Sequence, residues 1–142
     1  MKTVRQLLEA KGRHIYSVSP DSTVFEALKI MAEHRIGALL VLEGQHLAGV
    51  FSERDYAREV ALKGKTSRNT PVREVMSTTV ITVGPEHTVE DCMNLMSGKR
   101  IRHLPVIEHN TVIGVLSIGD LVKETIAYQE FLIQQLESYI QS

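Results

Sequence analysis

An internal duplication accounts for most of this chain of 142 residues. Residues 18–55 align with residues 83–120 at a constant offset of 65 and without a gap, and 14 of the 38 aligned pairs are identical. Two copies of one unit in a short chain usually pack against each other, and the cleft between them is a natural place for a ligand. The duplication therefore predicts two similar lobes with ligand sites between them.

The composition of the chain argues against several classes of function. The net charge is −1, so bulk charge does not indicate nucleic-acid binding. Cys92 is the only cysteine, which excludes an intramolecular disulfide and fits a reducing cytoplasm, where we expect the protein. The N-terminus has no apolar signal core, and no apolar run is long enough for a membrane span. The histidines do not repeat at metal-ligand spacing, so no metal site is expected.

Each copy has the pattern of a strand, a helix, two strands and a second helix. In copy one we expect strands at 15–18, 38–42 and 47–51, a helix capped by Asp21 or Ser22, and a second helix from Ser52 to about Leu62. In copy two the corresponding segments are 80–83, 88–99, 103–107, 112–116 and a helix from Ser117. The predicted fold class is α/β (α+β), with repeat 1 at 1–65, repeat 2 at 66–128 and a C-terminal extension at 129–142.

The last predicted helix is longer than its counterpart in copy one and extends to about Ile140. Its apolar positions alternate at spacings of four and three, a pattern typical of a helix that packs along one face. These positions are Val122, Ile126, Gln129, Ile133, Leu136 and Ile140. Beyond Gln129 the helix has no counterpart in copy one, so a partner chain is a plausible cover, and the alternative is packing against its own lobe.

A Ser-x-x-Asp motif follows a glycine-containing strand in both copies, at Ser52 with Asp55 and at Ser117 with Asp120. The simplest interpretation is a helix cap, in which the serine and aspartate satisfy free backbone groups. A carboxylate in a first helical turn also stays ionised, and it can accept hydrogen bonds from the vicinal hydroxyls of a ribose. A glycine within a strand suggests that something approaches the backbone closely. Capping and ribose binding are compatible.

Basic residues precede the second strand of copy two, and Arg54 lies within the copy-one motif. Arg102 and His103 are candidates for phosphate binding, because their counterparts in copy one are Gly37 and Ala38. The alternative is a solvated helix end, where cations meet the C-terminal dipole. The two sites are therefore expected to differ in their affinity for anions.

The duplicated motif together with the Arg-His-Leu-Pro-Val run at 102–106 resembles a tandem pair of CBS domains, also called a Bateman module. The resemblance extends from about Val4 to about Ala127, and the run at 52–56 is similar to that of stand-alone two-CBS proteins of bacteria and plant organelles. The resemblance implies two repeats about a pseudo-twofold axis with two clefts. It also implies a disc-like homodimer and adenosine ligands such as AMP, ADP, ATP, NAD or S-adenosylmethionine.

The resemblance further implies roles for individual residues. The motif aspartates would bind ribose hydroxyls, the motif serines would lie near ribose or phosphate, and the first strand of each copy would meet adenine. The ligand-binding residues expected on these grounds are Tyr16, Val18, Ser52, Arg54, Asp55, Val80, Ile81, Thr82, Arg102, His103, Ser117 and Asp120.

Three functions follow from these patterns. The first is a regulatory module that binds an adenosine nucleotide and signals to a partner protein without being an enzyme. The second is a ligand-independent dimerisation or interaction protein. The third, an enzyme acting on nucleotides, is the weakest, because neither motif places a general base beside a nucleophile. The downstream partner is not identified by the sequence.

Overall fold

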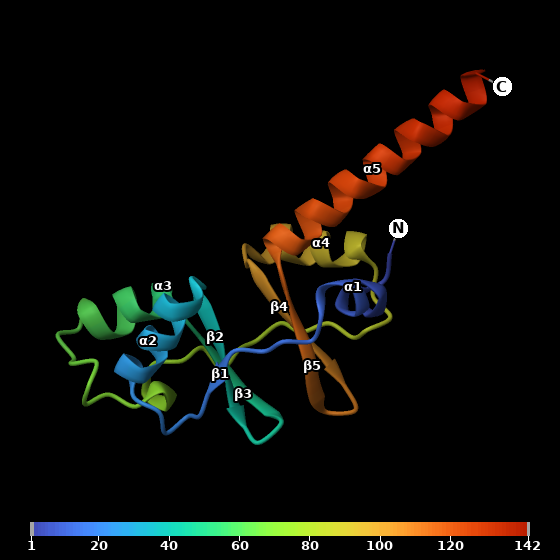
Figure 1. Ribbon diagram of the computed structural model, residues 1–142. Helices are drawn as coiled ribbons and strands as arrows, with labels where there is room; N and C mark the ends of the chain where they lie inside the picture. Colours follow the sequence, from blue (N-terminus) through green and yellow to red (C-terminus); the bar gives the residue numbers. More distant parts are fainter. Residues whose placement is uncertain (1, 142) are drawn as a thin grey trace. The chain divides into compact units, whose positions relative to one another are not determined.

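The computed structural model describes residues 2–141, and the predicted helices and strands are present except for the first strand of copy two (Figure 1). Copy one ends in a π-helical segment at 56–61, and copy two begins with a 3-10 turn at 72–74. The elements are α1 (Val4–Lys11), β1 (Ser17–Val18), α2 (Val24–His34), β2 (Ala38–Glu43), β3 (His46–Ser52), α3 (Glu53–Asp55), η1 (Tyr56–Ala61), η2 (Val72–Glu74), α4 (Val89–Lys99), β4 (His103–Glu108), β5 (Thr111–Ser117) and α5 (Ile118–Gln141).

The helices that follow the first strand begin and end alike in both copies. Thr23 caps α2 and Thr88 caps α4, each in a reciprocal capping box with the third helical residue, so the prediction of Asp21 or Ser22 as the cap was wrong. Both helices end at an arginine in the left-handed conformation, Arg35 and Arg100, each with φ 54°. The offset of 65 residues is thus preserved in the backbone as well as in the sequence.

The strands form a sheet of order β1-β2-β3 and a separate β4-β5 hairpin. β1 pairs with β2 in parallel, whereas 80–83 is not a strand and keeps only an isolated bridge between Val83 and Val106. The cause lies in the partner strand. In copy one the backbone N–H of Leu40 donates to Tyr16, but its counterpart in copy two is Pro105, which has no N–H to donate. The predicted first strand of copy two is therefore reduced to one bridge.

The structure divides into two compact units. Each unit contains the opening segment of the other copy, which is the stretch before that copy's first strand. The first-motif unit, which contains Asp55, consists of residues 14–81 with 108–112, so it includes η2 from the start of copy two. The second-motif unit, which contains Asp120, combines α1 with α4, β4, β5 and α5. The backbone N–H of Val4 donates to the carbonyl of His87 at 2.8 Å, and that of Arg5 donates to Pro85 at 2.9 Å. Each opening segment thus belongs structurally to the other copy's unit.

Each unit has an apolar core built from equivalent positions. Ala27 in α2 and Cys92 in α4 are both fully buried, as are Met31 and Met96 one turn later. Burial, with a smaller contribution from the charge of Asp91, raises the pKa of the Cys92 thiol to about 11. Cys92 is therefore a core residue whose thiol stays protonated at neutral pH.

The C-terminal helix α5 packs on α4 only through its first turns. Leu121 is fully buried, and Thr125 Oγ1 lies 3.1 Å from Met93 Sδ of α4. Beyond residue 128 every described residue of α5 is exposed, including Phe131, Ile133 and Leu136. Figure 1 shows that this part of α5 extends beyond α4. Within residues 2–141, no helix is both long and apolar enough to cross a bilayer.

Candidate functional site

The copy-one motif is an N-cap at the junction of β3 and α3. Ser52 ends the strand in an extended conformation, and its Oγ accepts a hydrogen bond from the backbone N–H of Asp55 at 3.1 Å. Asp55 Oδ2 accepts in return from the backbone N–H of Ser52 at 2.9 Å and from its hydroxyl at 3.0 Å. Asp55 Oδ1 accepts from the hydroxyl of Ser77 at 3.1 Å. The capping interpretation is therefore confirmed for copy one.

The copy-two motif repeats this geometry at the junction of β5 and α5. The backbone N–H of Ser117 donates to Asp120 Oδ2 at 2.8 Å, and the N–H of Asp120 donates to Ser117 Oγ at 3.1 Å. Here the further donor is a cation, because Lys11 Nζ lies 2.6 Å from Asp120 Oδ2 and 2.6 Å from the carbonyl oxygen of Val115. Sequence reasoning missed both Lys11 and Ser77, since each comes from the opening segment of the other copy.

The glycines of the two motif strands make room for these opening segments. A Cβ on Gly49 would stand 2.7 Å from the carbonyl oxygen of Ser77, and a Cβ on Gly114 would stand 2.6 Å from Leu8 Cδ2. Something does approach the backbone at both glycines, as the sequence suggested, but the approaching groups belong to the protein itself. The glycines therefore position Ser77 and α1 close to the motifs.

The electrostatics of the copy-two site are dominated by the Lys11–Asp120 pair. Burial by itself raises the pKa of Asp120, but hydrogen bonds from Lys11 and from the Ser117 backbone, with the charge of Lys11, hold that pKa below its usual value. Asp120 is therefore a carboxylate at neutral pH. Its side chain is 26% exposed and that of Lys11 is 36% exposed, so solvent and a ligand can reach both.

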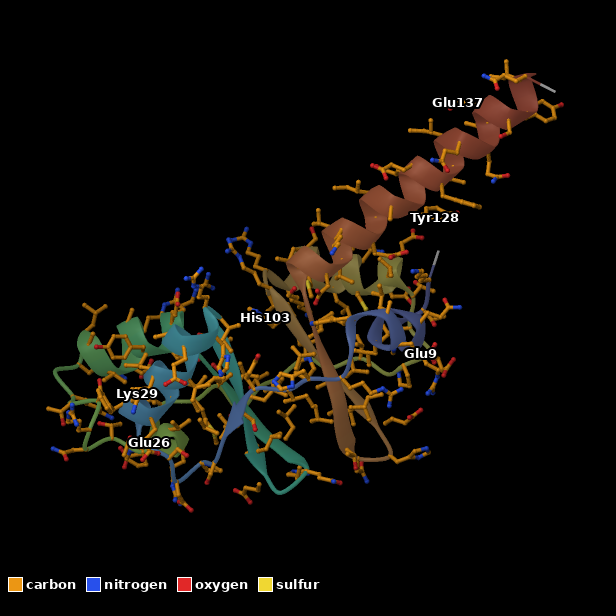
Figure 2. All side chains as sticks on the ribbon, in the orientation of Figure 1. Glu9, Glu26, Lys29, His103, Tyr128 and Glu137 are labelled. Carbon is orange, nitrogen blue, oxygen red and sulfur yellow. The ribbon has the colours of Figure 1, made fainter. Side chains whose placement is uncertain are left out.

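His103, labelled in Figure 2, is the first residue of β4, and Arg102 precedes it. Both belong to the same unit as Asp120. The carbonyl of Arg102 accepts from the backbone N–H of Ile118 at 2.9 Å, which joins the start of β4 to the start of α5. Burial lowers the pKa of His103, the charge of Lys11 lowers it further, and Asp120 partly offsets both. His103 is therefore neutral at pH 7 and lies within electrostatic range of Lys11, Asp120 and Arg102.

The positions of copy one that correspond to Arg102 and His103 are Gly37 and Ala38, which carry no charge. The carbonyl of Gly37 accepts from the N–H of Glu53 at 3.0 Å, the counterpart of the Arg102–Ile118 bond. Where copy two has Arg102, a Cβ on Gly37 would lie 3.7 Å from the Glu53 carboxyl carbon. Arg54 is exposed on α3. The two motif surroundings thus differ in charge, in the direction that the sequence predicted.

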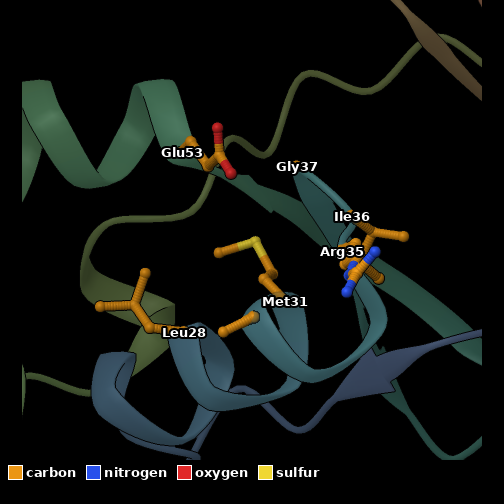
Figure 3. A pocket seen from close by; sticks show the side chains of 7 residues that line it. Leu28, Met31, Arg35, Ile36, Gly37 and Glu53 are labelled. Carbon is orange, nitrogen blue, oxygen red and sulfur yellow. The ribbon is translucent and has the colours of Figure 1, made fainter.

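A pocket of about 530 Å³ lies between the end of α2 and the start of α3 (Figure 3). Its walls are largely apolar, with Met31 and Leu28 from α2 facing Glu53 from α3 (Figure 3). Leu28, Met31, Ala32, Arg35, Ile36, Gly37 and Glu53 line it. None of the residues predicted to bind ligand is among them, and the carboxylate of Glu53 disfavours an anion there.

The remaining predicted residues fall into different environments. Tyr16 is half-buried between two histidine rings, edge-on to His14 at 4.4 Å and stacked on His34 at 4.0 Å. Val18 is buried in the core, so only its backbone could meet a ligand. Val80 and Ile81 belong to the first-motif unit, and Thr82 belongs to the second-motif unit. Among the described residues, no group of three or more His, Cys, Asp or Glu side chains could hold a metal ion.

Comparison with known proteins places these motifs in a family. The sequence model of the CBS domain matches residues 4–62 and 72–126. The chain is 38% identical to the mitochondrial CBS domain-containing protein CBSX3 of Arabidopsis thaliana, over 98% of this chain and 72% of the relative. It is 37% identical to the CBS domain-containing protein YhcV of Bacillus subtilis, over 75% of this chain and 76% of the relative.

Solved structures agree with the sequence relatives. A protein with CBS domains from Burkholderia ambifaria, regarded as a signal-transduction protein, is 48% identical with a TM-score of 0.84, over 89% of this chain and 95% of that one. A CBS-domain protein from Agrobacterium tumefaciens is 36% identical with a TM-score of 0.81, over 87% and 99%. This chain therefore belongs to the CBS-domain family and carries two CBS domains in tandem.

Proposed function

We propose that this CBS pair is a regulatory module that binds an adenosine compound, such as AMP, ADP, ATP or NAD, at its motif aspartates. Binding changes the conformation presented to a downstream protein, and the module itself catalyses no reaction. The cytoplasmic location stays a prediction, because one relative is named as mitochondrial.

The observation that carries this proposal is the state of the two motif carboxylates. Asp55 and Asp120 are oriented by the backbone N–H of their own motif serine, at 2.9 Å and 2.8 Å. A carboxylate offers about four acceptor positions. Three bonds are described for each aspartate, so each retains about one position for a ribose hydroxyl. A fixed, partly exposed carboxylate is what a ribose diol requires. The capping bonds supply the orientation that binding needs, so the two roles support each other.

A thermal-shift screen with AMP, ADP, ATP, NAD and S-adenosylmethionine tests this proposal. A ligand present at 100 times its Kd stabilises the native state by about 2.7 kcal/mol, which is a clear rise in Tm for a chain of this size. The absence of a shift with all five compounds at millimolar concentration would refute adenosine binding.

Three variants separate ligand binding from helix capping. Asp55→Ala and Asp120→Ala each remove a cap and a predicted ribose acceptor. Asp91→Ala is the matched control, because Asp91 makes the same capping bond to the N–H of Thr88 at 3.0 Å, outside both motifs. We expect each cap to contribute about 1 kcal/mol in all three variants, with the ligand-induced shift reduced only in Asp55→Ala or Asp120→Ala. Equal ligand shifts in all three variants would leave the motif aspartates with a capping role alone.

We also propose that α5 pairs with α5 of a second copy. Its exposed apolar residues continue the four-three spacing of a two-stranded helical interface, with Ile126 51% and Leu136 62% exposed. In this register Glu130 and Glu137 flank the seam on the same side. An antiparallel pair would set these glutamates against each other, whereas a parallel pair sets Glu130 against Thr125 and Glu137 against Leu132 of the second copy. The charges therefore favour a parallel homodimer.

Truncation after Tyr128 tests this pairing. Figure 2 shows that the cut removes the part of α5 that carries Glu137 and lies beyond α4. We expect the full chain to be a dimer by light scattering and the truncated chain to be a monomer with an unchanged ligand shift. A monomeric full chain at about 100 μM, a concentration at which a pair of micromolar affinity is assembled, would refute the pairing. Dimers that persist after truncation would place the interface elsewhere.

A further inference from the structure

The donors that reach the two motif aspartates from the opening segments differ in charge. Asp55 accepts a hydrogen bond from the neutral hydroxyl of Ser77 at 3.1 Å, and Asp120 accepts one from the ammonium group of Lys11 at 2.6 Å. Each donor comes from the opening segment of the other copy, and the two reach different carboxylate oxygens, Oδ1 of Asp55 and Oδ2 of Asp120. This difference lies outside the aligned repeat, because Lys11 precedes residue 18 and Ser77 precedes residue 83.

We propose that Lys11 is a specificity-determining residue of the copy-two site, where it donates to a phosphate of the bound ligand and selects phosphorylated adenosine compounds over unphosphorylated ones. This inference rests on the proposed function. The copy-one site, where Ser77 supplies only a neutral donor to Asp55, discriminates less between the two kinds of ligand.

The hydrogen-bond geometry leaves Lys11 able to do this. An ammonium group has three N–H donors, and the bonds to Asp120 Oδ2 and the Val115 carbonyl, both at 2.6 Å, use two of them. The third donor can meet a phosphate oxygen without breaking either bond. The bonds to the Asp120 side chain from Lys11 Nζ and from the backbone N–H of Ser117 both end on Oδ2, and the Ser117 side chain contributes a further hydrogen bond to this carboxylate. Of about four acceptor positions one therefore remains for a ribose hydroxyl while Lys11 faces the phosphate.

The surroundings reinforce this preference for an anion. Lys11, Arg102 and Asp120 each lie within electrostatic range of His103. The Lys11 charge is balanced by Asp120, so a phosphate finds the positive charge of Arg102 in addition to the free Lys11 donor. His103 is partly desolvated, and a charge-assisted hydrogen bond is stronger in such an environment than in water.

The position of Lys11 is fixed by packing rather than by the ion pair alone. Leu8, one turn earlier in α1, is fully buried, and it fills the space left by the missing side chain of Gly114. The backbone of α1 is held further by the bonds of Val4 and Arg5 to 85–87. A lysine on a docked helix loses little further freedom on binding, which favours selectivity.

Calorimetric titration of the full chain with AMP and with adenosine tests the inference. All variants are made in an Asp55→Asn background, which removes ligand binding at the copy-one site. The titration then measures binding at the copy-two site alone. In this background we expect Lys11→Gln to weaken AMP binding about tenfold or more and to change adenosine binding by less than about twofold. Lys11→Arg should retain the preference for AMP. Lys2→Gln is the control, since Lys2 pairs with Glu124 at 3.5 Å and the variant has the same net charge as Lys11→Gln.

The outcomes separate this inference from the proposed function. If the wild-type chain binds neither AMP nor adenosine, the proposed function and the inference both fail. If the wild type binds AMP but the Asp55→Asn background does not, the ligand uses the copy-one site and only the inference fails. If Lys11→Gln weakens AMP and adenosine equally, or does no more than Lys2→Gln, Lys11 has only a structural role and the inference is overturned.

Discussion

Replacing Gly114 by alanine tests whether the packing of α1 onto β5 builds the copy-two site. The new methyl group would stand 2.6 Å from Leu8 Cδ2 and 3.1 Å from Cδ1, whereas carbon atoms in contact prefer about 3.5–4.0 Å. Leu8 is fully buried, so it has no open space into which to move. Gly114→Ala therefore forces α1 away from the strand.

The magnitude follows from two opposing effects. Overpacking a close-packed interior costs about 1–3 kcal/mol. Replacing glycine by alanine restricts the unfolded chain and returns about 0.4–1 kcal/mol. We expect Gly114→Ala to lower the free energy of unfolding by up to about 2.6 kcal/mol. Because Lys11 is the last residue of the displaced helix, the variant should also weaken AMP binding at the copy-two site.

A double-mutant cycle with Leu8→Ala isolates the contact. Leu8→Ala alone leaves a cavity and should cost about 2–5 kcal/mol. In the double variant the methyl at residue 114 has room, so the combined loss should fall short of the sum by at least about 1 kcal/mol. Urea unfolding followed by far-UV circular dichroism measures all four proteins.

Gly98→Ala is the matched control for this cycle. Gly98 lies within α4, and a Cβ there would have no atom within 4 Å. The control should stabilise the chain by up to about 1 kcal/mol, through helix propensity. The reasoning is refuted if Gly114→Ala is no more destabilising than Gly98→Ala, or if the cycle is additive within about 0.3 kcal/mol.

Three further predictions concern individual residues. The pKa of His103 lies below its ordinary value of 6.5, so the unfolded chain binds a proton more readily than the native one, and stability is lost as the pH falls below that value; His103→Gln should flatten the decline of the urea midpoint between about pH 7 and 5, and an unchanged slope would contradict this. Cys92 is buried with a pKa of about 11, so a thiol reagent should modify it many times faster in urea than in the native state, and equal rates would disprove its burial. Thr23→Ala and Thr88→Ala should each cost about 1 kcal/mol in urea unfolding, and a loss near zero would contradict the capping boxes.

Much of the fold and part of the site could be read from the sequence. Apolar runs separated by polar turns predict β2 through β5, because a buried strand needs continuous apolar residues and a reversal needs a turn. The duplicated Ser-x-x-Asp predicts two caps, because the bonds of a cap join residues three positions apart. The matching positions at the offset of 65 predict that both copies share one backbone path.

Tertiary structure alone decided which segment completes each motif. Lys11 and Asp120 are 109 positions apart, and Ser77 and Asp55 are 22 apart. No local pattern records these pairs, since they arise when each opening segment packs into the other copy's unit. Likewise, the loss of the first strand in copy two depends on Pro105 in the partner strand, which lies outside the strand's own pattern. Short-range hydrogen bonds and hydrophobic periodicity can thus be predicted from the sequence. The charge of the donor that contacts each motif aspartate depends on long-range packing.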